Sequence, residues 1–497
     1  MRTSQLLPLA VLCAALSTGL AAFATRAANV TTDPAAGIAP IQDSDFYQDG
    51  RFSEDQVRLG QLLFFDKILS GNKNISCATC HHPAHGTSDG LALSLGEGAV
   101  GLATKRTVTA EAPVLGRVPR NSQALFFVGA KEFKRLFHDG RIETDANRNW
   151  ESGFWSPARE QLPAGLDNVL AAQAMFPVLS HIEMAGHKGE NAVATAVAKD
   201  ELDGPGGAWD LLAQRLRAIP AYVDLFKAAY PAIERAADIS FVHAANAIAA
   251  FETVAFRPDN SPFDKYLRTR DPTHLSAAAR RGMRLFYGSA GCAACHSGTF
   301  QTDQDFHAIA MPQIGPGKND GFDRSYWRAT GFVGRLEDVG RFRVTFDPAD
   351  KYRFRTPSLR NVALTGPWGH AGAYDSLDAV IRHHADPVGA LQRYDAAKAK
   401  LPRIAHVIER TAEGSKLIHR PVNPARLADY QRRDTWVLNT SALRDAIAQA
   451  NELNGPALRD DEVADLVEFL KALTDPSSRD QSHLIPNAVP SGLPVVD

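Results

Sequence analysis

Apolar side chains recur at helical spacing in three stretches of the chain. In the first, residues 241–255, they return every three or four positions, as in a helix with one buried face; they are Phe241, Ala244, Ala245, Ile248, Phe251 and Ala255. A second helix should begin near Ser276 and carry Met283 and Phe286. The third stretch holds Val463, Leu466, Val467, Leu470 and Leu473, and should end at Asp475 and Pro476. Helical patterns outnumber alternating ones, so the sequence predicts an all-α, mostly helical fold.

The helices are predicted to form two domains. Residues 257–262 read Arg-Pro-Asp-Asn-Ser-Pro, which breaks the helical pattern as a linker would. We therefore expect an N-terminal domain over residues 45–256 and a C-terminal domain over residues 275–475. Two further stretches, residues 200–207 and 411–433, are predicted to be loop-rich insertions.

The first 28 residues predict a secretory signal peptide. Arg2 supplies a positive start, and residues 6–23 form an apolar run that is short for a membrane span. Small residues at positions 22 and 24 offer a cleavage site, with positions 27 and 28 as alternatives. An uncleaved anchor is the other interpretation of this segment. We expect an exported, periplasmic protein.

Charge gives no indication of a nucleic-acid partner. The 497 residues carry 54 Lys and Arg against 56 Asp and Glu, which leaves a formal net charge of −2. A nucleic-acid-binding domain usually shows a strong basic excess, which this balance lacks.

The cysteines point to specific chemistry. Cys13 lies in the predicted signal peptide, and the other four form two C-x-x-C-H motifs at residues 77–81 and 292–296. Two thiols three positions apart can both add to the vinyl groups of one haem, and the histidine that follows can then bind its iron. Two disulfides or one Cys₄ zinc site are the alternatives, but neither needs a histidine after each pair. The sequence therefore predicts two covalently bound haem c groups, held by Cys77, Cys80, His81, Cys292, Cys295 and His296.

Between and after these motifs, from about residue 45 to about 475, the chain resembles the bacterial dihaem cytochrome c peroxidase and MauG family. The segments that carry the resemblance are residues 137–141 (Phe-His-Asp-Gly-Arg), 183–184 (Glu-Met), 354–361, 364–370 and 377–384. The resemblance implies two cytochrome c-like domains, each enclosing one haem. It also implies that the N-terminal haem is peroxidatic and that the C-terminal haem receives electrons.

The resemblance assigns three residues to the peroxidatic site. The glutamate of the Glu-Met pair matches Glu183, a glutamine ten positions earlier matches Gln173, and a proline six positions earlier matches Pro177. Cleavage of a peroxide O–O bond needs a base that takes a proton from one oxygen and returns it to the other. A carboxylate can do this, while an amide holds the oxidant in place.

The family also places a calcium ion between its two domains. Its ligands match Asn121, together with the backbone carbonyls of Thr365 and Pro367. Oxygen donors of this kind suit calcium.

Two departures concern the first haem. His138 stands where many members of the family have a tryptophan between the haems, which puts an indole relay in doubt. The loop of residues 86–120 contains no histidine, whereas members that need reductive activation have one there to cap the iron. His82 and His85 are too close in sequence to His81 to reach the opposite face. We therefore expect an open site at the first haem.

A third departure concerns the distal ligand of the second haem, which is methionine in typical peroxidases and tyrosine in MauG. The corresponding position, seven residues after Leu377, is His384. We expect a bis-histidine iron with His296 and His384, and His383 is the competing candidate.

These features favour a peroxidase that reduces hydrogen peroxide to water. The resemblance implies that a small cytochrome c or a cupredoxin supplies the electrons one at a time. A MauG-like enzyme that oxidises a protein or a small organic substrate is the alternative. A pure electron-transfer cytochrome would need a sixth ligand at the first haem, for which the sequence offers no candidate. Members of the family are often homodimers, so a homodimer is compatible with this interpretation.

Overall fold

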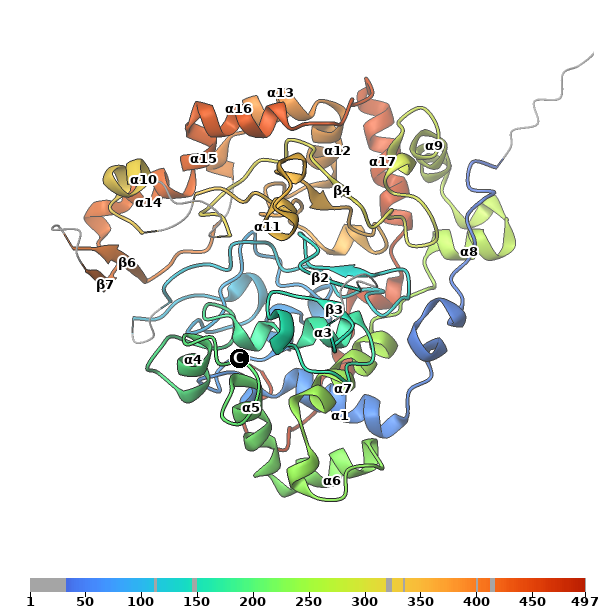
Figure 1. The fold of residues 1–497 in the computed structure, drawn as a ribbon. Coiled ribbons are helices and arrows are strands. Elements are labelled where there is room, and N and C mark those ends of the chain that lie inside the picture. Colours follow the sequence, from blue (N-terminus) through green and yellow to red (C-terminus); the bar gives the residue numbers. More distant parts are fainter. Residues whose placement is uncertain are drawn as a thin grey trace, which may run out of the picture.

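The computed structural model describes residues 33–496, apart from residues 111–113, 145–149, 319–323, 334–335, 399–400 and 412–415. The predicted signal peptide lies outside the described residues. Two groups of helices face each other across a layer of extended loops (Figure 1). No helix in the described part is long and apolar enough to cross a membrane.

The first group of helices surrounds one large hydrophobic core in the lower half of Figure 1. Its helices are α1 (Glu54–Phe65), α2 (Cys77–Cys80), α3 (Val169–Ala174), α4 (Ala192–Val197), α5 (Ala208–Arg217), α6 (Pro220–Ala229) and α7 (Phe241–Ala255). A small antiparallel sheet joins β1 (Arg135–Leu136), β2 (Ile142–Thr144) and β3 (Phe154–Trp155) in that order. The predicted helix over residues 241–255 is confirmed.

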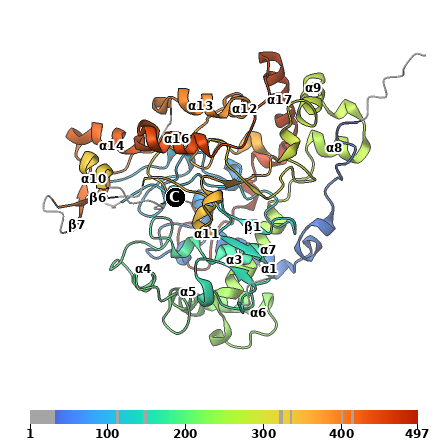
Figure 2. The same cartoon turned by 45° about the horizontal axis from the view of Figure 1, so that its top comes forward.

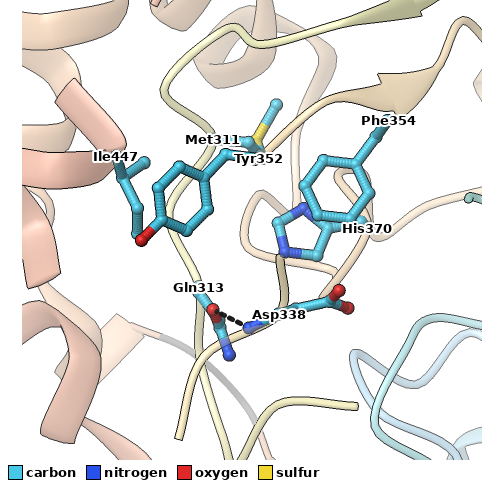
Figure 3. Close-up of a pocket in the computed structure, with 7 residues that line it drawn as sticks. All are labelled: Met311, Gln313, Asp338, Tyr352, Phe354, His370 and Ile447. Atoms are coloured by element: carbon cyan, nitrogen blue, oxygen red, sulfur yellow. Dashed lines mark hydrogen bonds between the residues drawn. The ribbon is translucent and has the colours of Figure 1, made fainter. Parts of the chain in front are cut away.

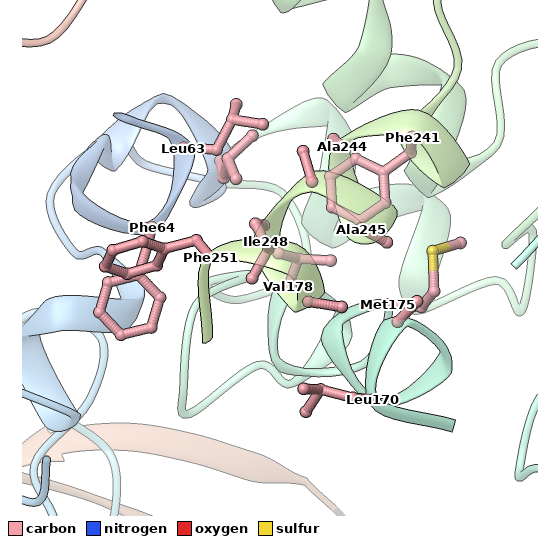
Figure 4. Close-up of a cluster of buried hydrophobic side chains, with 14 of the residues drawn as sticks. Leu63, Phe64, Leu170, Met175, Val178, Phe241, Ala244, Ala245, Ile248 and Phe251 are labelled. Carbon is pink, nitrogen blue, oxygen red and sulfur yellow. The ribbon is translucent and has the colours of Figure 1, made fainter. Parts of the chain in front are cut away.

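Helix α7 is the centre of this core because it is apolar on nearly every side. Leu63 and Phe64 of α1 pack on one side of it, and Leu170 and Met175 of the α3 region pack on another (Figure 4). The rings of Phe64 and Phe251 are 5.4 Å apart between centroids. Both the segment before the first C-x-x-C-H motif and the segment around Gln173 are thereby fixed to one rigid helix.

The second group contains a smaller core around two long helices. Its helices are α8 (Pro262–Thr269), α9 (Ala277–Phe286), α12 (Leu377–Ala385) and α17 (Asp460–Ala472). Ser276 caps α9 by accepting a hydrogen bond from the backbone N–H of Ala279, and α17 ends before Asp475 and Pro476. Both predicted helices are confirmed.

A third core lies next to the second. In Figures 1 and 2 its helices occupy the left of the upper half, and α8 and α9 of the second core lie at the right. Its helices are α10 (Arg324–Thr330), α11 (Phe342–Thr345), α13 (Pro387–Arg393), α14 (Leu427–Asp434), α15 (Trp436–Asn439) and α16 (Ser441–Gln449). Two antiparallel pairs accompany them, β4 (Phe306–His307) with β5 (Phe354–Arg355), and β6 (His406–Arg410) with β7 (Leu417–Pro421). The prediction of a loop-rich insertion at residues 411–433 is wrong, because β7 and α14 occupy much of it.

The C-terminal segment returns to the first group of helices (Figure 1). Leu484, Ile485 and Val489 pack against the first core, although the chain has just left α17 in the second group. The Ser491 hydroxyl donates to Asp66 at 2.6 Å. This segment lies outside both predicted domain ranges and ties the two groups together.

Candidate haem sites and the residues around them

The first C-x-x-C-H motif is presented by the short helix α2, which Ser76 and Thr79 begin with a reciprocal capping pair. The thiols of Cys77 and Cys80 are three positions apart on this turn. His81 follows it, and its Nδ1 lies 3.2 Å from the carbonyl oxygen of Thr87. A carbonyl only accepts, so Nδ1 carries the proton and Nε2 is the nitrogen that can bind a metal. This orientation suits the axial ligand of a haem.

The second motif has the same arrangement. Cys292 begins the 3₁₀ turn η10 (Cys292–Ala294), and Nδ1 of His296 lies 3.2 Å from the carbonyl oxygen of Gln301. None of the four cysteines of the two motifs forms a disulfide. Among the described residues the four thiols do not gather into one metal-binding group. The two motifs fit two separate haems better than either alternative.

His384 and His383 differ sharply in what their ring nitrogens do. His384 places Nδ1 2.8 Å from the carbonyl oxygen of Val380, one turn earlier on α12, which leaves Nε2 for a metal. Burial, together with the nearby imidazole of His384, lowers the pKa of His296 to about 4. His383 is fully buried and uses both nitrogens, with Nε2 2.7 Å from the Ile309 carbonyl and Nδ1 2.8 Å from the Tyr374 hydroxyl.

The geometry therefore favours His384 over His383 as a partner of His296. A histidine whose two nitrogens are both hydrogen-bonded would have to break a contact in order to bind iron. His384 needs no such change, because its Val380 contact is the support expected for a ligating imidazole.

Glu183 lies on a tight turn at the first site. The backbone N–H groups of Glu183, Met184 and Ala185 all donate to the carbonyl of Ser180, at 2.9 to 3.1 Å. A contact from another segment also holds the turn in place, because the N–H of Gly71 donates to the Met184 carbonyl at 2.7 Å. Burial lowers the pKa of His81, and hydrogen bonding and the negative charge of Glu183 partly offset this decrease. Glu183 thus belongs to the surroundings of the first motif.

Gln173 and Pro177 lie on the chain that leads into this turn. Gln173 is near the end of α3, and Pro177 begins the 3₁₀ turn η7 (Pro177–Leu179). Met175, which lies between these two residues, and Val178, which follows Pro177, are buried in the first core. Gln173 and Pro177 themselves are half-buried. The structure places all three predicted residues on one anchored run of chain.

The loop of residues 86–120, which contains no histidine, packs along the turn that carries Glu183. A Cβ on Gly96 would lie 2.0 Å from the backbone oxygen of Ile182, and the N–H of Glu97 donates to the same oxygen at 3.1 Å. Buried Arg106 holds the loop together through hydrogen bonds to the carbonyls of Leu95 and Gly96. Of the two histidines near His81, His85 is exposed, while Nδ1 of buried His82 accepts from the N–H of Ala84.

A buried ion network joins the two halves between the sites. Arg120 pairs with Asp338 at 2.6 Å and with Asp139 at 2.7 Å, and Asp139 also meets Arg141 at 3.2 Å. Burial opposes ionisation of Asp139, but the two arginines outweigh it and hold the pKa of Asp139 well below its usual range. The Phe-His-Asp-Gly-Arg segment is therefore a structural bridge between distant parts of the chain.

His138 lies within this bridge as a neutral side chain. Burial and the charge of Arg120 lower the pKa of His138 to about 3. Its Nε2 is 3.2 Å from the carbonyl oxygen of Asn121, so the proton sits on Nε2. The N–H of Arg355 donates to the backbone oxygen of His138 at 2.8 Å.

The predicted calcium ligands lie on two segments that touch. The backbone N–H of Asn121 donates to the carbonyl of His370 at 2.8 Å, three residues after Pro367. The amide nitrogen of Asn121 donates to the carbonyl of Leu91 at 2.8 Å, so its side-chain oxygen is the atom a cation would use. An oxygen donor and the 365–367 carbonyls on adjoining segments fit a calcium ion, and the site stays a prediction.

Beside these segments is a small cavity of about 10 Å³, shown in Figure 3. His370 stacks on Phe354 with ring centroids 3.8 Å apart, and Asp338 lies next to it on the cavity wall. Burial lowers the pKa of His370 to about 4. In the described part of the chain neither ring nitrogen of His370 has a hydrogen-bond partner. A cavity of this size suits one water molecule.

Cys295, Asp303 and His307 form a group with metal-ligand atoms within 4.8 Å of one another. His307 Nε2 lies 2.8 Å from Asp303 Oδ2. Because Cys295 is predicted to attach the second haem, we assign no separate metal to this group.

Residues 54–272 match the family described as di-haem cytochrome c peroxidase. The chain is 32% identical to the methylamine utilization protein MauG of Methylorubrum extorquens over 331 residues, which cover 66% of this chain and 68% of that protein. It is 30% identical to the cytochrome c551 peroxidase of Pseudomonas aeruginosa over 383 residues, which cover 76% of this chain and 85% of that protein. The chain belongs to the di-haem cytochrome c peroxidase family. It is an oxidoreductase of that type.

Solved structures support the fold assignment. A MauG-like protein associated with microbial copper homeostasis aligns with a TM-score of 0.52 at 24% identity, covering 90% of this chain and 95% of that chain. The diheme peroxidase BthA of Burkholderia thailandensis aligns with a TM-score of 0.51 at 19% identity, covering 89% and 90%. At these identities the likeness concerns the fold alone.

The structure of this di-haem peroxidase family member adds one residue that sequence reasoning missed. Lys318 Nζ lies 4.0 Å from Oε1 of Glu183. No sequence motif surrounds Lys318, and its partner is far away in the chain, so no local pattern could have identified it.

Proposed function

We propose that this chain is a periplasmic peroxidase that reduces hydrogen peroxide to water with electrons from a small soluble cytochrome c or cupredoxin. The observation that carries the proposal is the position of Glu183 on a fixed turn in the surroundings of His81, whose Nε2 is left for a metal. Family membership supports the reaction class, and the names of relatives such as the cytochrome c551 peroxidase support the choice of donor.

Two haems would be held by the residues of the two motifs. Cys77 and Cys80 would form the thioethers of the first with His81 as axial ligand, and Cys292, Cys295 and His296 would do the same for the second. His384 would supply the remaining ligand of the second iron. When bound, the haems supply the one-electron chemistry that amino-acid side chains lack.

The side chains around the first haem would transfer protons and hold the peroxide in place. Reduction of one hydrogen peroxide to two waters consumes two electrons and two protons. Glu183 would take the proton from one peroxide oxygen and return it to the departing oxygen, which leaves as water. Gln173 would orient the peroxide through its amide, and Pro177 would shape the wall of the site.

Electrons would enter at the second motif and pass to the first. The second motif suits this role because the two residues between its cysteines, Ala293 and Ala294, are half-buried and exposed, whereas Ala78 and Thr79 of the first motif are buried. The buried contacts of Arg120, Asp139 and Asp338 would keep the two sites at a fixed separation. A calcium ion at Asn121, Thr365 and Pro367 would serve the same purpose.

Steady-state assay of the purified holoenzyme tests the proposal. Consumption of hydrogen peroxide should be matched by oxidation of two equivalents of a reduced small cytochrome c or cupredoxin. Failure of every such donor, with peroxide-dependent oxidation of a protein or small organic substrate instead, would favour the MauG-like alternative. Export is tested by locating the mature N-terminus in periplasmic extract.

A further inference from the structure

A lysine from the C-terminal half reaches the Glu183 turn. Lys318 Nζ lies 4.0 Å from Glu183 Oε1, and the two side chains keep only 15% and 22% of their surface exposed. The pair is therefore shielded from solvent, although the two residues belong to different halves of the chain.

The position of Lys318 is set by close backbone packing. The N–H of Gly317 donates to the carbonyl of Leu336 at 3.1 Å, and a Cβ on Gly317 would lie 2.4 Å from the carbonyl carbon of Glu337. Two residues earlier, the N–H of Gly315 donates to the carbonyl of Asp434 at 2.8 Å. The segment before Lys318 is thus fixed to the third core, and its direction is not left to a flexible surface loop.

The surroundings of Lys318 hold charges of both signs. Burial, with the charges of Arg141 and Arg120 acting in the same direction and Glu183 and Asp139 opposing, lowers the pKa of Lys318 to about 8. Arg141 is itself held over the ring of Phe137, with its guanidinium carbon 3.5 Å from the centroid. Glu183 also faces the imidazoles of His81 and His181.

Stability alone gives a poor reason for this arrangement. Moving an ammonium group out of water beside two arginines is costly, and a single carboxylate at 4.0 Å returns only part of that cost. A chain selected for stability would gain as much from an apolar side chain at this position. An effect of the Lys318 ammonium group on Glu183 explains better than stability why a lysine occupies this position.

We propose that Lys318 is a positioning residue for Glu183, holding its carboxylate in the orientation in which it accepts a proton from peroxide. This inference rests on the proposed peroxidase function. A cation fixed beside the carboxylate restricts the rotamers that the carboxylate can adopt, which keeps the base within reach of its proton.

The test compares Lys318→Met with Lys318→Arg in the full-length holoenzyme. Lys318→Met should lower kcat/KM for hydrogen peroxide about tenfold, while Lys318→Arg should retain most of the wild-type rate. Combined with Glu183→Gln, Lys318→Met should have almost no further effect, because the lysine acts through the glutamate. Lys199→Met is the matched control, since Lys199 pairs with Glu201 at 3.6 Å on the exposed surface.

Cyanide binding supplies a readout that is independent of turnover. Hydrogen cyanide must lose a proton when it binds as the anion, so Lys318→Met should weaken cyanide binding at the first site about tenfold near neutral pH, as followed by visible absorption. Wild-type cyanide affinity and wild-type kcat/KM in Lys318→Met would overturn the inference. Absence of peroxide turnover in the wild type would overturn the proposed function instead, and the cyanide comparison would still decide the role of Lys318.

Discussion

Gly282 on α9 touches the backbone of Asp465 on α17, and a Cβ atom at Gly282 would lie 2.0 Å from the Asp465 carbonyl oxygen. The same relationship occurs in the other half, where a Cβ on Gly60 of α1 would lie 1.8 Å from the carbonyl oxygen of Ala247 on α7. In each half, the helix that precedes the C-x-x-C-H motif therefore crosses a later helix at a glycine. This repeated crossing is the clearest structural sign that the two halves share one plan.

Gly282→Ala should destabilise the protein. Alanine favours an isolated helix over glycine by about 1 kcal/mol, so any loss of stability must come from the forced separation of α9 and α17. Overpacking of this kind typically costs about 1–3 kcal/mol. Denaturant unfolding of the holoenzyme measures the change. Gly116→Ala is the control, because a Cβ there would meet nothing within 4 Å; equal stability of the two variants would contradict the packing argument.

Local sequence patterns predicted the parts of this structure that depend on local rules. The helix over residues 241–255 follows from its apolar periodicity, and the start of α9 follows from Ser276 as a cap. The hairpin of β6 and β7 was missed because its strands mix charged, apolar and imidazole side chains without a clean alternation. Its two strands are specified by pairing with each other over five residues each, which no local pattern of the separate strands records.

The surroundings of the first motif show the limit of sequence reasoning most clearly. Glu183 could be identified because it matches a short family motif. Lys318 could not, because its place beside Glu183 depends on where Gly317 meets Glu337 in the folded chain. Arg120 likewise gains its partner Asp338 only through tertiary packing.

Asp139→Asn should unfold more readily than the wild type. The substitution leaves the buried charges of Arg120 and Arg141 with one partner fewer, and breaking a buried pair typically costs about 3–5 kcal/mol. Denaturant unfolding at pH 7 gives this difference. Asp378→Asn is the control, because Asp378 pairs with Arg382 on the exposed surface.

The same aspartate should give stability a distinct pH dependence. The pKa of Asp139 is lower in the folded protein than in the unfolded chain, because the two arginines outweigh burial. Its contribution is therefore fully present above the unfolded value of about 4 and is lost as pH falls below it. The wild type should lose stability below about pH 4 more steeply than Asp139→Asn, and parallel curves would contradict this assignment.

The fully oxidised enzyme should turn over peroxide without prior reduction. The loop of residues 86–120 contains no histidine that could cap the first iron, and its Gly96 and Glu97 are packed against the Glu183 turn. Stopped-flow assays of oxidised and pre-reduced enzyme should show no lag in either sample. A lag that only pre-reduction removes, or low-spin spectra for both haems, would speak against an open first site.

Glu183→Gln should retain both haems and lose most peroxide turnover. The amide keeps the size of the side chain and removes the base, and such groups typically contribute about 10²–10⁴-fold. Haem content and kcat/KM are measured on the same preparation. Glu201→Gln, an exposed glutamate paired with Lys199, controls for loss of a carboxylate. Near-normal turnover in Glu183→Gln would refute its role as the base.

His384→Ala and His383→Ala should have opposite effects on the second haem. Nδ1 of His384 is supported by the Val380 carbonyl and Nε2 is left for iron, whereas His383 uses both nitrogens on Ile309 and Tyr374. His384→Ala should therefore convert the second haem from low spin to a vacant or water-bound site. His383→Ala should leave the ligation unchanged and lower stability, because it leaves the Ile309 carbonyl without its buried partner.

Low-temperature electron paramagnetic resonance with a redox titration decides between the two histidines. Methionine raises a haem potential relative to histidine, so His384→Met should raise the potential of the second haem while keeping it low-spin. Loss of the low-spin signal in His383→Ala, with its survival in His384→Ala, would assign the ligand to His383. An unchanged signal in both variants would place the ligand outside α12 and would refute both His384 and His383 as the second ligand of this haem.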